Sequence, residues 1–464
     1  MGICFSSSSS SRRKPPCGGA STATPAWPDL PPDLAGVILG CLPSHADRVR
    51  FAAVCRHWRS AARQQLPLIP PPLPWISFNN GHFQILPGGE AHALPDPGPA
   101  RLRCYSTFDG VVLRELHGRA RACSLFDPFR DVSMDLPPPC RHGSGYDDPY
   151  AQFPKWPTFR KLLVCSDGGG GAAVAALFKP NFREKPKIIG ICRPDAAGAA
   201  AWALHVRRDD DGWYEDVSFF RGKLYALDSR GHLYEFDLGG TNGTNGGGGG
   251  GRPAAKLTRP TRVMRYAPGQ EEPVPAALAA AAVQGARRTT RRYLVVSGDK
   301  LLMIRWSIVE DDRADACQMS ALGLSDEEPA MAFAVFQAGW NTTAWSEVTS
   351  TAALEDQVLF VSRGCSLALR ASDYRYAGAG AGDAGVRGGR VFYLEDDGFA
   401  RYVGRGRKWN LRVCGVYDLR DGTAWQVELR DGGRTWTGWP GDGDKDGGRT
   451  GLPLEYIKGN ELVP

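Results

Sequence analysis

The sequence predicts a mainly β protein, in which a small N-terminal module of three helices precedes a β-propeller of six or seven blades. Composition is the first reason, since 57 glycines and 35 prolines among 464 residues indicate many tight turns. Pattern is the second, because beyond residue 74 apolar runs of four to eight residues alternate with Gly, Asp-Gly and Pro. Spacing is the third: blades of about 50 residues would fit about seven times, and six or seven times after inserts are subtracted.

Charge and cysteine usage exclude several classes of protein. The 56 basic and 50 acidic residues give a net charge of +6, which is too small to indicate a nucleic-acid or membrane protein. We expect no membrane-spanning helix and no secretory signal, because no apolar run approaches the required length. The twelve cysteines are scattered without a Cys-x-x-Cys pair. This indicates a reducing compartment, with neither a disulfide framework nor a zinc ribbon.

Residues 1–26 are rich in Ser, Pro and Gly, contain no acidic residue, and are expected to be a disordered tail. They also match the Met-Gly-x-x-x-Ser pattern of N-myristoylation, with Gly2 as the acceptor, and Cys4 could carry a palmitoyl chain. The basic run 12–14 could contact anionic lipid, and two or three such signals are needed for stable anchoring. An inert tail and an organellar transit peptide remain alternatives.

Residues 27–66 show helical periodicity. Apolar residues recur at i, i+3, i+4, i+7 and i+8, namely Leu34, Val37, Ile38, Cys41 and Leu42. Pro31 and Pro32 suit the first turn of this helix, and Pro43 ends it. Ser44 and Asp47 have the spacing of a capping box for a second helix, and a third short stripe follows from Val54. Three helices of this size cannot bury so much apolar surface alone, so we expect a partner.

The same stretch resembles an F-box. The matching elements are Leu30-Pro31, Asp33-Leu34, Ile38-Leu39, Leu42-Pro43, Asp47, Arg50-Phe51 and the run Val54-Cys55-Arg56-His57-Trp58-Arg59. A generic helical hairpin is the alternative. The resemblance implies docking on a Skp-type adaptor of a cullin–RING ubiquitin ligase. The residues expected to form this interface or the core of the module are Leu30, Pro31, Leu34, Ile38, Leu39, Leu42, Val49, Phe51, Val54 and Trp58.

A stiff, Pro-rich linker is expected at 67–74, followed by a propeller-like domain at 75–430 and a C-terminal tail at 431–464. Within the domain, 216–237 predicts hairpins with turns at Arg221-Gly222 and Arg230-Gly231, and 391–417 predicts another hairpin. Surface inserts rich in Gly, Ala or polar residues are expected near 239–256, 267–291, 309–330 and 376–389.

The large domain resembles the C-terminal domain of plant F-box proteins of the KIB type, which is thought to be a kelch-like propeller. The resemblance rests on four stretches and a few single residues. The stretches are SLFDPF at 124–129, DVSFFRGKLY at 216–225, LFVSRGCS at 359–366 and RVFY at 390–393. It implies a plant source. The long Gly-rich inserts and the tail after residue 430 depart from the family pattern.

Other chemical motifs are weak. Asp442, Asp444 and Asp446 begin a calcium-loop pattern, but Pro453 occupies the position of the required Glu. The glycines at 378–385 lack the βαβ context of a dinucleotide site. The Cys and His residues at 41–57 have the wrong spacing for a zinc finger. A basic and aromatic patch at 401–412 equally fits a solvated strand pair. No cofactor or metal is expected.

These observations predict a non-catalytic substrate receptor of an SCF-type ubiquitin ligase, in which the F-box binds the adaptor and the propeller binds a target protein. It is expected in the cytoplasm or nucleus, or at the plasma membrane if the tail is acylated. The main alternative is a protein that acts outside a ligase and blocks a signalling kinase or transcription factor. A propeller enzyme is a third class, which would need carboxylates that converge at the centre of the ring.

Overall fold

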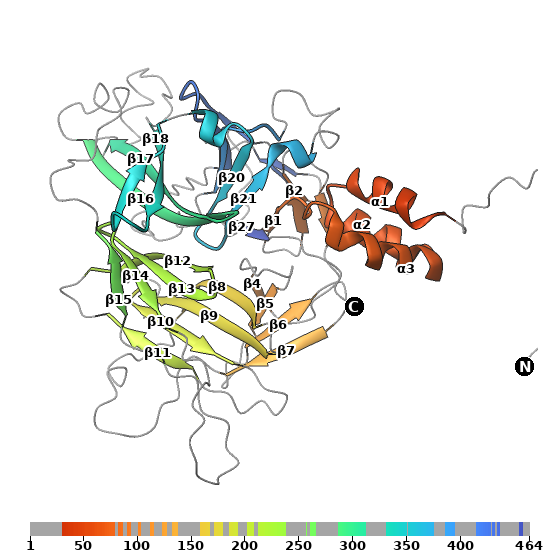
Figure 1. The fold of residues 1–464 in the computed structure, drawn as a ribbon, viewed down its shortest axis with the longest axis horizontal. Helices are drawn as coiled ribbons and strands as arrows, with labels where there is room; N and C mark the ends of the chain where they lie inside the picture. Colours follow the sequence, from red (N-terminus) through yellow and green to blue (C-terminus); the bar gives the residue numbers. More distant parts are fainter. Residues whose placement is uncertain are drawn as a thin grey trace, which may run out of the picture.

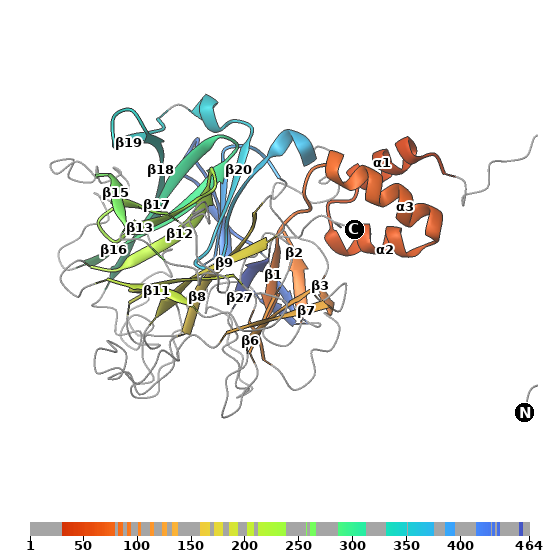
Figure 2. The same cartoon turned by 60° about the horizontal axis from the view of Figure 1, so that its bottom comes forward.

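A computed structural model shows three helices standing to one side of a β domain, beside β1 and β2 (Figures 1 and 2). The structure describes residues 30–78, 82–86, 91–93, 101–103, 112–115, 123–127, 132–137, 158–167, 171–179, 185–193, 202–207, 212–237, 257, 260–265, 286–311, 331–349, 351–374, 386–394, 414–427, 429–431, 434–436 and 454–457. The predicted architecture, three N-terminal helices followed by a mainly β, propeller-like domain, is confirmed.

The helical module consists of α1 (Pro32–Gly40), α2 (His45–Ala53) and α3 (Arg56–Gln65), followed by the 3-10 helix η2 (Leu66–Leu68). Local chemistry sets their starts. Proline occupies the first position of α1, and the Ser44 hydroxyl accepts a hydrogen bond from the Asp47 backbone N–H at 3.4 Å. The Ser44 half of the predicted capping box is therefore confirmed, whereas the Asp47 carboxylate pairs with Arg50 at 2.6 Å. The small core of the module comprises Ala35, Leu39, Phe51, Ala52, Ala61, Ala62 and Leu66.

The described residues form six sheets of four or five strands and one two-stranded sheet, against a predicted six or seven blades. The first sheet holds β27 (Leu454–Ile457), β1 (Trp75–Phe78), β2 (His82–Ile85) and β3 (Ala91–Ala93). The second holds β4 (Arg101–Arg103), β5 (Val112–Glu115), β6 (Cys123–Asp127) and β7 (Val132–Leu136). The third holds β8 (Thr158–Asp167), β9 (Gly171–Lys179), β10 (Ile188–Cys192) and β11 (Ala203–Val206).

The remaining sheets follow in chain order. The fourth holds β12 (Tyr214–Phe220), β13 (Lys223–Asp228), β14 (Leu233–Phe236) and β15 (Thr261–Met264). The fifth holds β16 (Ala286–Ser297), β17 (Lys300–Asp311), β18 (Met331–Gly339) and β19 (Ala344–Glu347). The sixth holds β21 (Ser366–Arg370), β20 (Gln357–Val361), β22 (Arg390–Leu394), β23 (Cys414–Asp418) and β24 (Ala424–Gln426). β25 (Leu429–Asp431) pairs with β26 (Arg434–Trp436).

The edge strands β8, β12, β16 and β21 belong to four different sheets and lie beside one another in that order. Apolar side chains from adjacent sheets fill the space between them, as where Val217 and Leu224 pack with Leu177 and Ile189. Packing faces of neighbouring sheets together buries the apolar surface of each strand on both sides. The arrangement therefore brings one strand of each of these sheets to a common centre.

The hairpin of β12 and β13 has the turn that its sequence predicts. Arg221 and Gly222 adopt φ values of 48° and 74°, the left-handed pair that a two-residue hairpin turn requires. Strand pairing then runs from Phe220–Lys223 to Tyr214–Asp228 with one bulge. Gly231, in the second predicted turn, has φ 82°, and β14 pairs with β13 after it. The expected hairpin at 391–417 is also present as β22 and β23.

Three expectations about boundaries need correction. β16 begins at Ala286 and β17 extends to Asp311, so the insert expected at 267–291 ends earlier and the one expected at 309–330 begins later. The tail expected to be separate from residue 431 onward supplies β27, which pairs antiparallel with β1. Sequence patterns miss this pairing because the two strands lie far apart along the chain and each is only four residues long.

The Pro-rich segment is packed between the module and the propeller. Arg48 of α2 donates to the carbonyl oxygens of Leu42 at 2.8 Å and Pro70 at 2.7 Å. The Leu73 backbone N–H donates to the Pro43 oxygen at 2.8 Å, and the Tyr374 hydroxyl donates to the Pro71 oxygen. These hydrogen bonds attach the segment to both neighbours.

Aromatic and apolar contacts complete this junction. The ring of His45 lies 5.7 Å from that of Trp75, centroid to centroid. Ala46 of α2 belongs to the same buried cluster as Leu73 and Trp75, which also contains side chains of the sixth sheet. The module is therefore packed against the propeller and not merely tethered to it.

Among the described residues, no helix is long and apolar enough to cross a membrane. Within the same part of the chain, no group of three His, Cys, Asp or Glu residues could hold a metal ion. Gly2 and Cys4, the insert at 239–256, the glycines at 378–385, the basic patch at 401–412 and Asp442–Asp446 lie outside the described residues.

Candidate functional site

The surface of α1 that faces away from the module core is apolar. Leu34 and Val37 lie one helical turn apart, with 53% and 65% of their surface exposed. On the opposite side of the helix, Ala35 and Leu39 are fully buried in the module core. Val54, at the end of α2, is 61% exposed. Isolated exposed apolar residues are common, but three in the module at 27–66 indicate a contact surface.

The predicted interface residues separate into two groups. Leu39 and Phe51 are buried, at 0% and 6% exposure, and form the core of the module. Leu30, Ile38 and Leu42 are partly buried and pack against that core. These five residues hold the helices together. They fix the position of the contact surface, and other residues form most of that surface.

The other predicted residues are half-buried or exposed. Trp58 packs against the same core, where it stacks on the Phe51 ring at 4.5 Å, and it is half-buried, as is Val49. Pro31 is exposed at the start of α1. Together with Leu34 and Val54, these residues are accessible to a partner.

A side chain at the start of α3 brings two parts of this surface together. His57 Nε2 lies 3.0 Å from the carbonyl oxygen of Leu30, which places the segment after Val54 beside the first turn of α1. Val37 was part of the predicted helical stripe but not of the predicted interface. The buried residues Ala35 and Leu39 lie outside this stripe, and its members are exposed or only partly buried, so the stripe marks the side of α1 that faces away from the core.

The centre of the propeller contains a second cluster, which is charged and buried. Lys161 Nζ on β8 lies 2.6 Å from Asp216 Oδ1 on β12, and both side chains are almost fully buried. Asp216 also accepts hydrogen bonds from the backbone N–H groups of Val217 at 2.8 Å and Leu294 at 2.7 Å. The Ser366 hydroxyl donates to Asp216 Oδ2 at 3.1 Å. One carboxylate thereby connects β8, β12, β16 and β21, and the buried charges are paired as burial requires.

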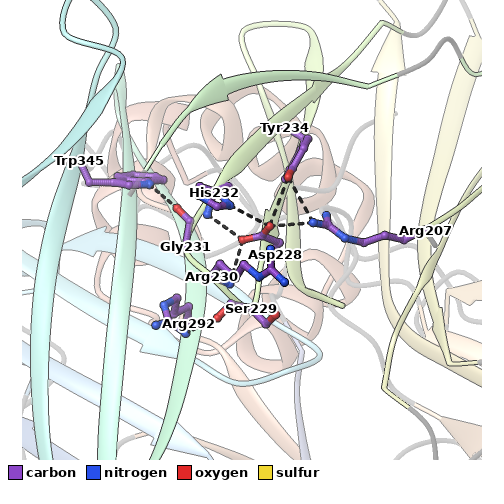
Figure 3. A network of polar contacts seen from close by, with 9 residues as sticks. All are labelled: Arg207, Asp228, Ser229, Arg230, Gly231, His232, Tyr234, Arg292 and Trp345. Carbon is purple, nitrogen blue, oxygen red and sulfur yellow. Dashed lines mark hydrogen bonds and ion pairs between the residues drawn. The ribbon is translucent and has the colours of Figure 1, made fainter. Parts of the chain in front are cut away.

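A further network surrounds the turn between β13 and β14 (Figure 3). The buried Asp228 carboxylate accepts hydrogen bonds from Arg207 Nη2 at 2.8 Å and from the Tyr234 hydroxyl at 3.3 Å. It also accepts from the backbone N–H groups of Arg230 and His232 at 2.9 and 2.7 Å. Burial lowers the pKa of Arg207, but its hydrogen bond to Tyr234 and its electrostatic interactions with Tyr214, Tyr234 and Asp228 outweigh this and raise it.

The next sheet holds the same turn from its other side (Figure 3). Trp345 Nε1 donates to the Gly231 carbonyl oxygen at 2.8 Å, and Arg292 Nη1 donates to that of Ser229 at 3.0 Å. These contacts are between groups of the chain itself, and they fix one sheet against the next. Their chemistry is that of a rigid scaffold, which is what a binding surface made of loops needs.

Two family models match the chain. The model described as the KIB1-4 beta-propeller matches residues 83–418, and the model described as F-box-like matches residues 27–66. A comparison with curated proteins found no significant match. The F-box-like match covers α1, α2 and α3, and the propeller match contains the Asp216 and Asp228 networks.

Proposed function

The chain belongs to the family of F-box proteins with a KIB1-4 β-propeller, and on this premise we propose that it is the substrate-recognition subunit of an SCF-type ubiquitin ligase. In this role the F-box binds a Skp-type adaptor, and the propeller binds the protein to be ubiquitinated. F-box and propeller domains are typical of non-catalytic adaptor proteins. The chain then contributes proximity and orientation to a reaction that another subunit catalyses.

The observation that carries this proposal is the exposed apolar surface of the module. Leu34, Val37 and Val54 stay in solvent although the core of the module is already filled by other side chains. Burial of such side chains contributes about 1.5–3 kcal/mol each, so a partner that covers them gains a large driving force. An interface of this kind matches a helix-based docking surface.

The packed junction between the two domains supports the same role. Arg48 and Leu73 join the Pro-rich segment to the module, and Tyr374 joins it to the propeller. A receptor must hold its target at a fixed distance from the transferring enzyme. A flexible linker would lower the effective concentration of the target at that enzyme, and a packed linker avoids this.

We further propose that the protein is cytoplasmic or nuclear, and that acylation of Gly2 and Cys4 brings a fraction of it to the membrane.

The experiment is a calorimetric titration of the full chain with a purified Skp-type adaptor. We expect saturable binding, and a loss of at least tenfold in affinity when Leu34, Val37 and Val54 are all replaced by Ala. The matched control is Met134→Ala, which removes an exposed apolar side chain from the propeller (39% exposed) and leaves the affinity within twofold.

Thermal unfolding must be unchanged in the triple variant for this comparison to hold. No binding at tens of micromolar by a folded wild-type chain would contradict the receptor role. That result would favour the alternative of an inhibitory binding protein that acts outside a ligase.

A further inference from the structure

Two turns from neighbouring sheets are joined by stacked aromatic rings. Phe220, the last residue of β12, stacks on Trp340 in the turn between β18 and β19, with ring centroids 5.8 Å apart and an interplanar angle of 6°. Tyr225 of β13 lies 5.4 Å from the same Trp340 ring, centroid to centroid. Phe220 and Tyr225 are buried, whereas Trp340 is half-buried. These ring contacts fix the turn of the fourth sheet against that of the fifth.

Arg221, which follows Phe220 in the turn between β12 and β13, adds a guanidinium group to these rings. Its Cζ lies 4.9 Å from the centre of the Phe220 ring. Its Nη2 donates to the carbonyl oxygen of Asp299, in the turn between β16 and β17, at 3.1 Å. Arg221 is exposed, and within the part of the chain that the structure describes no carboxylate pairs with it. A guanidinium has five N–H donors, so this one keeps donors for a ligand while these contacts hold it in place.

The backbone of both turns adopts a conformation that their side chains disfavour. Among the described residues, only Arg221 and Thr343 have a positive φ without being glycine, at 48° and 52°. Threonine is β-branched, and Asn-Gly is the pair that suits a turn such as the one at Arg221. Thr343 is held by its carbonyl oxygen, which accepts from the Arg265 backbone N–H at 3.1 Å. Strain of this kind concentrates at ligand-binding sites, and here it occurs in the two turns that the aromatic rings join.

The space beside these turns is open. Gly222 and Gly298 have φ values of 74° and 58°. Apart from its chain neighbours, a Cβ added to either glycine would meet no atom of the described chain within 4 Å. Residues 341–343, which follow Trp340, are exposed. Glycine turns allow another chain to approach the backbone closely, so a partner can reach Arg221 and Trp340 together.

We propose that this turn surface, made by Arg221, Asp299 and Trp340, is where the propeller binds its target, and that the target presents a carboxylate next to an apolar side chain. The inference rests on the proposed function, because it names the site and the chemistry of target recognition. The planar guanidinium of Arg221 matches a carboxylate through two parallel hydrogen bonds. Trp340, on the same Phe220 ring, offers apolar surface to the neighbouring side chain. Trp and Arg are among the residues that most often dominate the binding energy of a protein interface.

A carboxylate fits these observations better than a basic or a phosphorylated segment. Glu235 of β14 is engaged by Lys223 and by the Tyr225 hydroxyl, which donates at 3.0 Å, so it does not compete for Arg221. Asp299 contacts Arg221 through its backbone oxygen. A basic segment would be repelled by the guanidinium. Phosphate groups are bound by clusters of arginines, whereas one guanidinium matches one carboxylate.

The test begins with random twelve-residue peptides that are displayed on phage and selected on the full chain. The enriched peptides are synthesised with a fluorescent label, and their affinity is measured by fluorescence polarisation. We expect them to share an Asp or Glu next to an aliphatic or aromatic residue. Replacing that acidic residue by its amide, or Arg221→Asn in the protein, should weaken binding at least tenfold. Arg63→Gln, which changes an exposed arginine on α3, is the matched control and should stay within twofold.

Arg221→Asn also separates binding from folding. Asn adopts a positive φ more readily than Arg, so the thermal unfolding midpoint of this variant should not fall although its peptide affinity does. A residue with a purely structural role would lose stability as well. Trp340→Ala tests the apolar half of the surface and should weaken peptide binding at least fivefold. If Trp340→Ala does not fold, the Arg221→Asn comparison decides the outcome.

Several results would overturn the proposal. They are absence of enriched peptides, enriched peptides without an acidic residue, undiminished binding by Arg221→Asn or by folded Trp340→Ala, and a lowered midpoint of Arg221→Asn. Tighter binding of a phosphoserine twin would overturn the choice of a carboxylate. Adaptor binding is measured on the same samples. Failure of peptide binding alone refutes this site, whereas failure of adaptor binding alone refutes the receptor role.

Discussion

The helical module leaves large apolar side chains in solvent, whereas the propeller encloses charged ones. Leu34, Val37 and Val54 are each more than half exposed, while Lys161 and Asp216 are at most 2% exposed. In the module, the exposed groups have no partner within the core that the helices build. In the propeller, the buried charges are partnered by groups from several sheets. The module therefore offers a surface that another molecule can cover, whereas the propeller pairs the charges of Lys161 and Asp216 within itself.

The largest effect is expected when one charge is removed from the buried Lys161–Asp216 pair. Asp216→Asn leaves Lys161 buried without a counter-charge, and we expect the free energy of unfolding to fall by about 3–5 kcal/mol. Urea denaturation of the full chain measures this loss. Asp135→Asn, on the exposed side of β7, is the matched control and should change stability by less than about 0.5 kcal/mol.

A second variant separates burial from pairing at this site. Adding Lys161→Met to Asp216→Asn removes the unpaired charge, and stability should recover in part. If the single variant were as stable as the wild-type chain, the pair would not be the contact that joins β8 to β12.

The elements that sequence analysis predicts best are those whose cause is local. The Ser44 cap, the Arg221-Gly222 turn and the strands beside that turn each depend on a few consecutive residues. The parallel pairing of β20 with β22 does not depend on neighbouring residues. β21 lies between these two strands in the sequence, but in the sheet it lies at the edge, on the other side of β20. No short pattern encodes such a route.

In the candidate sites too, sequence analysis predicts only what neighbouring residues determine. The F-box residues were found because they lie within 40 consecutive positions, although their period could not show that Leu39 and Phe51 face inward. In the sequence, Asp216 stands out only as part of the stretch 216–225 that resembles the family. Its partners Lys161 and Ser366 are 55 and 150 residues away, and a single sequence holds no signal that relates them.

Asp418 is paired with Arg420, which is half exposed, so its contribution to stability should be smaller than that of the buried Lys161–Asp216 pair. The hydrogen bonds from the Arg420 side chain lower the pKa of Asp418 to about 2, although its own burial opposes this, and Arg390 Nε lies 3.5 Å away. The folded pKa is below the unfolded value of about 3.9, so this contribution is present above about pH 4 and is lost as the pH falls toward 2. Because Arg420 is half exposed, we expect about 1–2 kcal/mol.

The measurement compares urea denaturation of the wild-type chain and Asp418→Asn between pH 7 and pH 2.5. The difference in unfolding free energy should shrink as the pH falls below 4. A difference that stayed constant with pH would mean that the contribution of Asp418 is not electrostatic.

The junction between module and propeller can be weakened without touching either interior. Tyr374→Phe removes the hydroxyl that donates to the Pro71 carbonyl oxygen and keeps the ring in its buried cluster. We expect a loss of about 1 kcal/mol, since one hydrogen bond is lost and the carbonyl can accept from water. Hydrogen exchange should increase in residues 70–74 and leave β12 and β13 unchanged. Faster exchange throughout the propeller would show that Tyr374 supports the sheet and not the junction.

The smallest effect on stability is expected where the effect on binding is largest. Leu34→Ser removes an apolar side chain that is 53% exposed, so the unfolding free energy should change by less than about 0.5 kcal/mol. Leu39→Ser, five residues along the same helix, places a hydroxyl in the module core and should cost about 2–5 kcal/mol, measured by circular dichroism at 222 nm during urea unfolding. Both variants should weaken adaptor binding, but only Leu39→Ser should do so by unfolding the module. If Leu34→Ser destabilised the helices as much as Leu39→Ser, Leu34 would be part of the core, and its exposure could no longer support a docking surface.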